Sequence, residues 1–166
     1  MKNQLSSLEI SYLIKELDRE MVLWDGVCIV HESFDIDKLL KMVEEQPDAH
    51  IIAHPESAPH ILEVAKFVGS TTGLLNYVKN SIHNKFIVAT EPGILHEMQR
   101  ENPSKVLIHA PVGDDQSCNC SECPYMKLNT MQKLYDCLNN ESPEILMEEE
   151  LRLKALKPIR RMLELS

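Results

Sequence analysis

The sequence predicts an α/β fold in which short parallel strands alternate with single helices. Four apolar runs have the length of strands, and amphipathic patterns with helical spacing lie between and after them. Such alternation is typical of βαβ units, which carry helices on both faces of a parallel sheet and form three-layer α/β/α sandwiches. The expected strands are residues 21–24, 50–53, 86–89 and 106–108.

Each helix between these strands is predicted from a start signal and an apolar stripe. Asp35 can cap the first helix, which Pro47 then breaks. Pro59 opens the second, whose apolar face is expected to run as far as Val68. Residues 69–73 form a turn of small residues whose backbone N–H groups can face an anion, and a third helix follows it. A fourth helix is expected over residues 94–101.

Two further helices are expected after the last strand. Asn129 is a good cap for the first of them, and Cys137 beside its apolar face is expected to be a buried, inert thiol. The second covers residues 147–163, where Pro158 marks a kink or a boundary.

Composition restricts the class of partner. The chain has 166 residues and a formal net charge of −9, which argues against binding nucleic acid through its phosphates. No run approaches the roughly 18 apolar residues of a membrane span, and no secretory signal is recognisable. A cytoplasmic protein is therefore expected. In that reducing compartment, an odd number of cysteines favours metal binding or free thiols over a disulfide framework.

Three of the five cysteines lie within six positions, in a segment with no hydrophobic period. They are Cys118, Cys120 and Cys123. Thiolates at such spacing serve a structural zinc ion, an iron–sulfur cluster or a redox disulfide. Zinc usually takes its four ligands from two short-spaced pairs, and no second close Cys or His pair of that kind appears elsewhere, which disfavours a self-contained zinc site. A cluster tolerates ligands far apart in sequence, which draws attention to Cys28.

Polar and thiol side chains follow all four expected strands. Because ligands bind at the carboxyl ends of parallel strands, these groups are expected to face one edge of the sheet. They are Cys28 and His31, His54 and Glu56, Thr90 and Glu91, and the cysteine loop. His54 and Glu56, separated by the stiff Pro55, could bind a carboxylate and move protons. The other histidines are interpreted as structural hydrogen-bonding groups: His50, His60, His83, His96 and His109.

Taken together and in order, these motifs strongly resemble the quinolinate synthase family. The segments that carry the resemblance are residues 24–31, 53–57, 68–71, 89–94 and 120–129, and the similarity runs from about residue 21 to residues 157–159. The resemblance implies condensation of iminoaspartate with dihydroxyacetone phosphate to quinolinate, the precursor of the pyridine ring of NAD. It also implies L-aspartate oxidase as the supplier of iminoaspartate. The implied cofactor is a [4Fe–4S] cluster on three cysteines, with one iron left open as a Lewis acid.

Carried over by position, Cys28 resembles the middle cluster ligand and Cys123 the last. Cys118 and Cys120 resemble accessory cysteines that form a redox-sensitive pair. His31 corresponds to a residue near the cluster.

The substrate residues are likewise implied by the resemblance. His54 and Glu56, with Pro55 between them, resemble the residues that bind and deprotonate the part derived from iminoaspartate. Ser70 and Thr71 resemble a turn that binds a carboxylate.

The family fold comprises three related α/β/α domains about a pseudo-threefold axis, of which this chain resembles the C-terminal part. We expect a poorly matched segment over residues 1–20 and a remnant of a preceding domain over 21–48. A complete α/β/α domain is expected over 49–126, followed by C-terminal helices over 127–166. The first cluster cysteine of the family has no counterpart here, so this chain is expected to be truncated and inactive alone.

Three origins remain open for such a chain: a truncated gene product, one half of a split enzyme, or a fragment of a broken gene. The rival interpretation is a non-catalytic module in which Cys118, Cys120 and Cys123 bind zinc or act as a thiol switch.

Overall fold

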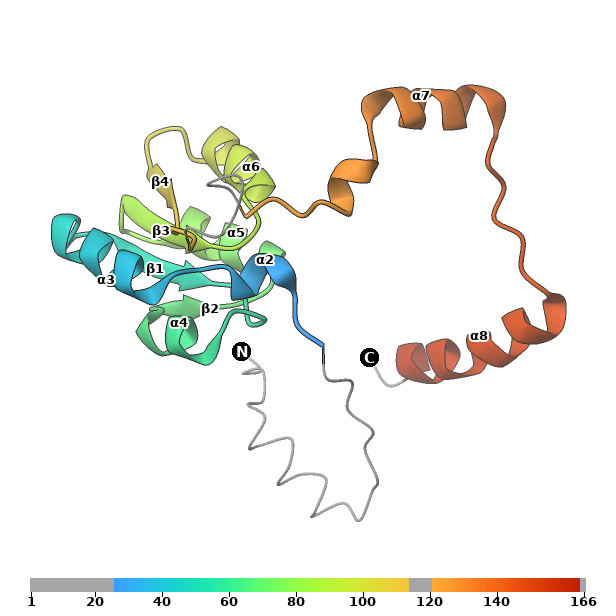
Figure 1. The fold of residues 1–166 in the computed structure, drawn as a ribbon, viewed down its shortest axis with the longest axis horizontal. Coiled ribbons are helices and arrows are strands. Elements are labelled where there is room, and N and C mark those ends of the chain that lie inside the picture. The colour runs from blue at the N-terminus through green and yellow to red at the C-terminus, as the bar shows by residue number, and fades with distance from the viewer. Residues whose placement is uncertain (1–25, 114–120, 165–166) are drawn as a thin grey trace, which may run out of the picture. The chain divides into compact units, whose positions relative to one another are not determined.

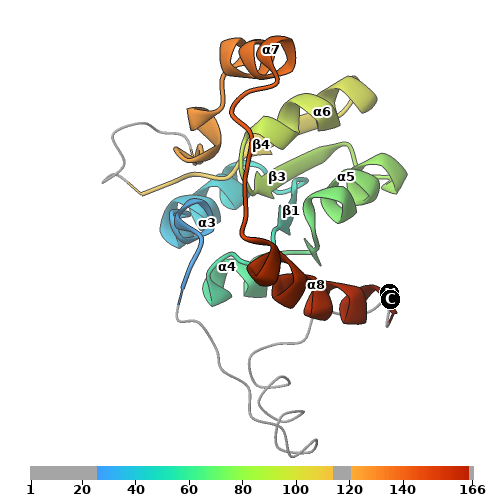
Figure 2. The same ribbon diagram turned by 90° about the vertical axis from the view of Figure 1, so that its right-hand side faces the viewer.

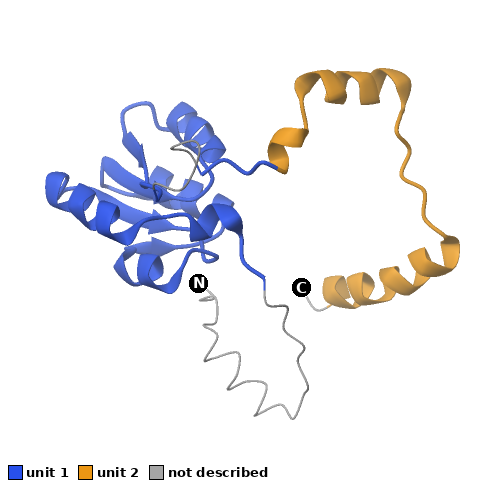
Figure 3. Ribbon diagram, viewed as in Figure 1, with its two compact units in different colours: residues 1–124 blue, residues 125–166 orange. Residues whose placement is uncertain are grey.

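The computed structural model describes residues 26–113 and 121–164 (Figure 1). The chain divides into two compact units, the first ending at Pro124 and the second running from Tyr125 to Ser166 (Figure 3). Each unit is considered by itself. The finer boundaries expected at residues 20, 48 and 126 remain predictions.

The first unit is built on a parallel sheet, which confirms the predicted α/β class. Its strand order is β2-β1-β3-β4, and every neighbouring pair runs in parallel. The strands are β1 (His50–Ala53), β2 (Phe67–Val68), β3 (Lys85–Ala89) and β4 (Val106–His109). Three of the four predicted strands are thus present, and the one expected over residues 21–24 lies outside the described residues.

Helices cover both faces of the sheet, because successive strand residues point to opposite sides. On one face, Ile51 and Ile87 pack with residues of α3 (Ile36–Glu45) and α4 (Pro59–Val64). On the other, Ile52 and Val88 pack with residues of α5 (Thr71–Asn80) and α6 (Gly93–Glu101). Figures 1 and 2 show the resulting three layers.

The connections leave β1 and β3 in opposite directions along the sheet. From β1 the chain passes through α4 to β2, whereas from β3 it passes through α6 to β4 on the other side. Right-handed crossovers that move in opposite directions must use opposite faces, as observed here. Where two such connections diverge, the carboxyl ends of the strands leave a crevice that binds ligands in open α/β sheets. That point lies between β1 and β3.

The segment before α3 packs against the chain that leaves β4. Cys28 is the N-cap of a short helix, α2 (Ile29–Glu32), and Phe34 forms an antiparallel bridge with Val112. The backbone N–H of Asp35 donates to the carbonyl of Pro111 at 3.0 Å. These bonds fix α2 beside the end of β4, within reach of the same sheet edge.

One helix start agrees with the sequence, and another lies inside the turn expected over residues 69–73. Asp35 caps α3, with its carboxylate accepting from the N–H of Lys38 at 3.0 Å. Ser70 caps α5, with its hydroxyl accepting from the N–H of Gly73 at 3.2 Å.

The expectation that the helix opened by Pro59 carries an apolar face as far as Val68 is wrong. The helix ends at Val64, and Phe67 and Val68 pair with Ile52 and Ala53 as strand β2. The N–H of Lys66 already donates to the carbonyl of Ile51 at 2.8 Å, so a sheet ladder replaces the helical hydrogen bonds there.

The second unit contains a 3₁₀ turn (Met126–Leu128), α7 (Met131–Asn140) and α8 (Glu149–Glu164). Thr130, rather than the expected Asn129, caps α7, and Pro158 lies inside α8 rather than at its boundary. Cys137 is exposed on α7, contrary to the expected buried thiol, because no other element covers that apolar face within this unit. No helix in the described part of the chain is long and apolar enough to cross a membrane.

The core of the first unit can be tested at Leu74, which is fully buried between α5 and the sheet. The change Leu74→Ala should lower the free energy of unfolding by about 2–5 kcal/mol, because it removes buried methyl groups and leaves a cavity. Urea unfolding followed by far-UV circular dichroism measures this. Ile82→Ala is the control, since Ile82 is 89% exposed and its truncation should cost less than about 0.5 kcal/mol. Equal effects of the two changes would contradict the packing described.

Candidate functional site

The ends of the strands bring His54, Thr90 and Gly69 side by side. The N–H of His54 donates to the carbonyl of Ala89 at 3.1 Å, which extends the ladder between β1 and β3 by one residue. On the other side of β1, the N–H of Gly69 donates to the carbonyl of Ala53, also at 3.1 Å. These residues therefore line the carboxyl edge of the sheet, where β1 and β3 diverge.

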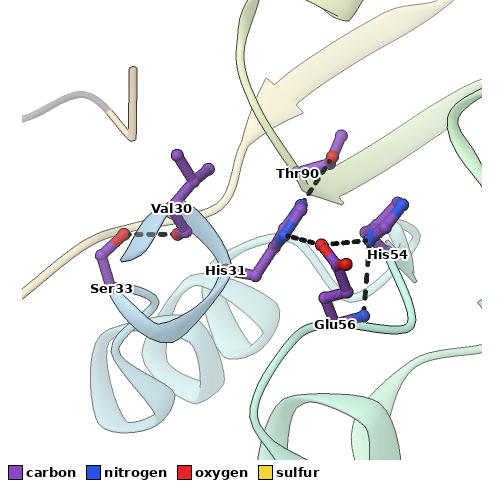
Figure 4. Close-up of polar contacts among 6 residues, drawn as sticks. All are labelled: Val30, His31, Ser33, His54, Glu56 and Thr90. Atoms are coloured by element: carbon purple, nitrogen blue, oxygen red, sulfur yellow. Dashed lines mark hydrogen bonds and ion pairs between the residues drawn. The ribbon is translucent and has the colours of Figure 1, made fainter. Parts of the chain in front are cut away.

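His31 lies at the centre of the polar contacts at this edge (Figure 4). It comes from α2 and is buried. Its Nε2 lies 3.1 Å from the hydroxyl oxygen of Thr90, which is itself buried at the end of β3. Its Nδ1 lies 3.2 Å from Oε2 of Glu56, a distance typical of an ion pair, but without the alignment of a hydrogen bond. His31 thus connects α2 to the ends of both β1 and β3.

His54 stacks on His31, with ring centroids 4.4 Å apart and planes inclined by 8°. Its Nδ1 accepts a long hydrogen bond, 3.4 Å, from the N–H of Glu56 and lies 3.7 Å from Oε2 of the same residue. An Nδ1 that accepts carries no proton, so a neutral His54 has its proton on Nε2. The Glu56 side chain is 61% exposed and can reach a ligand outside the protein.

The environment lowers the pKa of both imidazoles below its ordinary value. For His31 the main cause is burial, followed by the neighbouring His54, while Glu56 acts in the opposite direction. For His54 burial again dominates and Glu56 opposes it. Two stacked rings resist simultaneous protonation, because like charges would face each other in a partly dry site. Both rings are therefore neutral near pH 7 and available as ligands or proton acceptors.

A thiol completes this cluster. Three possible ligand atoms lie within 4.8 Å of one another: the sulfur of Cys28, a ring nitrogen of His31 and a carboxylate oxygen of Glu56. Cys28 is half-buried at the start of α2. The structure thus brings together four of the predicted site residues, Cys28, His31, His54 and Glu56, with Pro55 in the turn between the last two.

The end of the cysteine loop is held against the same helix. The hydroxyl of Ser33, just after α2, donates to the carbonyl of Val30 at 2.7 Å. Its oxygen lies 2.9 Å from that of Ser121, so the buried Ser121 hydroxyl is the donor in that contact. Cys123 is half-buried two residues further on. Cys118 and Cys120 lie outside the described residues.

Ser70 and Thr71 lie at the start of α5, directly after β2. Because β2 pairs in parallel with β1, this turn is at the same sheet edge as His54. Both side chains are exposed, and the Ser70 hydroxyl is engaged with Gly73. The turn offers exposed hydroxyl and backbone N–H groups at the positive end of a helix.

Sequence reasoning missed the roles of Thr90, Ser33 and Ser121 in fixing this site. Thr90 follows a predicted strand, and that position is the only signal in the sequence for its contact with His31. The two serines carry no motif, because their pairing depends on two segments 88 positions apart.

Three of the histidines interpreted as structural hydrogen-bonding groups make contacts in the described part of the chain. His109 lies 2.9 Å from the backbone carbonyl of Thr90, and His50 stacks on His83 with centroids 3.6 Å apart.

The stacked pair predicts a pH dependence of stability. A histidine whose pKa is lower in the folded chain than the ordinary value of about 6.5 stabilises the fold above that value. This stabilisation is lost as the pH falls below about 6.5 toward the lowered pKa. In the metal-free chain, NMR titration of the ring protons should therefore give pKa values for His31 and His54 below that of a model histidine peptide. Urea unfolding should require less denaturant at pH 5 than at pH 7.5, and an ordinary or raised pKa at both rings would contradict the described burial.

Comparison with known proteins identifies the family. A family model described as quinolinate synthetase A protein matches residues 8–164. A quinolinate synthase from Thermosynechococcus vestitus is 54% identical over 155 residues, covering 93% of this chain and 48% of that protein. Quinolinate synthases from Cyanothece sp. and Chloroherpeton thalassium are 52% and 50% identical over the same shares of chain and relative.

The chain spans about half the length of these curated relatives. Identity of this extent, along almost the whole of this chain, leaves no doubt about its relationship to them. The chain belongs to the quinolinate synthase family.

Proposed function

We propose that this chain provides one half of a quinolinate synthase active site, for the condensation of iminoaspartate with dihydroxyacetone phosphate in NAD biosynthesis. The observation that carries the proposal is the group of Cys28, His31, His54 and Glu56 at the divergence point between β1 and β3. An oxidase acting on L-aspartate would supply the iminoaspartate. The other half of the site would come from a region corresponding to the remaining length of the relatives.

The residues present fit two of the three thiolate ligands of a [4Fe–4S] cluster. Cys28 is a half-buried thiol beside a buried imidazole, and Cys123 follows a serine that is hydrogen-bonded to the end of the same helix. Partial burial shields a cluster from solvent while leaving one side open for substrate. When bound, the cluster would supply an open iron that acts as a Lewis acid. Cys28 and Cys123 would hold it, together with a third thiolate from the region of the relatives that this chain does not span.

His54 and Glu56 would bind and deprotonate the part derived from iminoaspartate. The exposed carboxylate of Glu56 is suited to accept a proton, since it is close to two imidazoles that can share the charge. Neutral His54 carries its proton on Nε2 and can donate it to a substrate oxygen. The stack with buried His31 restricts rotation of the His54 ring and so orients that donor.

The start of α5 would bind a substrate carboxylate. Helix α5 has ten residues, and the N–H groups of its first turn point toward the sheet edge that carries His54. Thr71 is exposed there and adds a hydroxyl donor. Two charged ends of a dicarboxylic imine could thus be bound separately, one at this turn and one near His54.

The test adds a polypeptide for the region of the relatives that this chain does not span. A polypeptide corresponding to the N-terminal half of a close relative is mixed with this chain and reconstituted anaerobically with iron and sulfide. The mixture should form quinolinate and show the broad visible absorption of an iron–sulfur protein. Cys28→Ser and Cys123→Ser should each abolish both signals, because each removes a thiolate ligand.

Cys137→Ser is the matched control, because Cys137 is exposed on α7 in the second unit. It should leave absorption and product formation unchanged. Absence of quinolinate when both halves are folded would refute the split site. The rival zinc or thiol module would be favoured by two results together. The parent chain would give no cluster signal, and mutation of Cys118, Cys120 or Cys123 would abolish its zinc uptake.

Glu56→Gln tests the proton transfer in the reconstituted enzyme. The amide keeps the size of the side chain but cannot accept a proton, so kcat should fall by about 10²–10⁴-fold. The visible absorption of the cluster should be retained. Steady-state assay of quinolinate measures the change, and a variant with normal kcat would exclude Glu56 as the base.

A further inference from the structure

We propose that Cys28, His31 and Glu56 bind a single divalent ion of the zinc type when no cluster is assembled on this chain. One atom from each residue lies within 4.8 Å of the other two, so a central ion could contact all three after small side-chain movements. The inference goes beyond the proposed function and does not rest on it, because it uses only these residues and needs no second polypeptide.

The first support is the state of the His31 ring. His31 is 7% exposed, and its buried Nδ1 has no hydrogen-bond partner in the described chain, although Oε2 of Glu56 is 3.2 Å away. A buried polar atom without a hydrogen bond destabilises the fold. Nδ1 lies next to the Glu56 carboxylate, and a ring nitrogen of His31 lies within 4.8 Å of the Cys28 sulfur, so coordination to an ion would satisfy Nδ1.

The second support is Thr90 on the opposite side of the ring. The hydroxyl oxygen of Thr90 lies 3.1 Å from Nε2 of His31, and the residue is 3% exposed. If Nε2–H donates to this oxygen, the lone pair of the neutral ring is on Nδ1, the nitrogen beside Glu56. A metal-binding histidine almost always has its other nitrogen held by such an acceptor. Thr90 would therefore be a positioning residue that selects the tautomer able to bind the ion.

The third support is the chemistry of the three ligands. A thiolate, an imidazole and a carboxylate are the ligand types of zinc, and three protein ligands leave a fourth position open. The exposed Glu56 side chain can move closer without disturbing the core. His54 is excluded as a ligand through Nδ1, since that atom accepts from the backbone of Glu56. Binding would displace the thiol proton of Cys28 into solvent.

The ion and the cluster would exclude each other, because both require the sulfur of Cys28. The experiment therefore uses the reduced, metal-free chain with Co²⁺ alone, without iron, sulfide or substrate. Cobalt replaces zinc in such sites and gives a charge-transfer absorption when a thiolate coordinates. We expect one ion per chain with that absorption, which Cys28→Ser should abolish and Zn²⁺ should displace.

Thr90 supplies a test that leaves all three ligands intact. Thr90→Val keeps the shape but removes the acceptor for Nε2–H, and should weaken Co²⁺ binding about 10–100-fold. Thr90→Ser keeps the hydroxyl and should bind like the parent chain. Far-UV circular dichroism confirms that both variants are folded, and equal affinities of the Val and Ser variants would overturn the role of Thr90.

Two cysteine controls locate the ion. Cys123→Ser and Cys137→Ser should both retain the charge-transfer absorption, because neither thiol belongs to the proposed set. Loss of the absorption in Cys123→Ser, its persistence in Cys28→Ser, or the absence of stoichiometric binding to the parent chain would each overturn the proposed site. None of these results depends on quinolinate formation, so this inference and the proposed function can fail separately.

Discussion

The pairing of β1 with β3 is the constraint on which the candidate site depends. Four residue pairs in parallel register, His50 with Phe86 through Ala53 with Ala89, align the carboxyl ends of these strands. The bond from His54 N–H to the Ala89 carbonyl then places His54 next to Thr90. Since His31 contacts Thr90 and stacks on His54, its position follows from this alignment. A one-residue slip would separate these groups and would also exchange the residues that face the two core clusters.

The described strands differ in how readily their sequences predict them. The segments 50–53 and 86–89 are apolar, short and followed by proline-containing turns, so they are recognisable as buried strands. Strand β2 has only Phe67 and Val68, and Val68 also extends the helical spacing of the preceding segment. Periodicity cannot distinguish a two-residue strand from one more helical turn. Phe67 and Val68 form a strand because they pair with β1, and a local sequence pattern carries no information about that tertiary contact.

The candidate site was predictable in its residues but not in its contacts. Cys28, His31, His54 and Glu56 could be chosen because each follows an expected strand and because the motifs resemble one family. Their stacking and the contact of His31 with Thr90 depend on the approach of α2 to the sheet edge, which the bridge between Phe34 and Val112 fixes. The exposure of Cys137 was predicted wrongly because an apolar helical stripe indicates a face that can be buried, without saying what covers it.

The two alanines that end β1 and β3 have a practical consequence for engineering. Ala53 and Ala89 are fully buried and directly precede His54 and Thr90. Any larger side chain introduced there to fill the interior would displace the backbone that carries the reactive groups. A library designed to raise thermal resistance should therefore keep both alanines and vary positions on the outer surfaces of α3 to α6. In this fold, two positions with no room for a larger side chain lie one residue away from the candidate site.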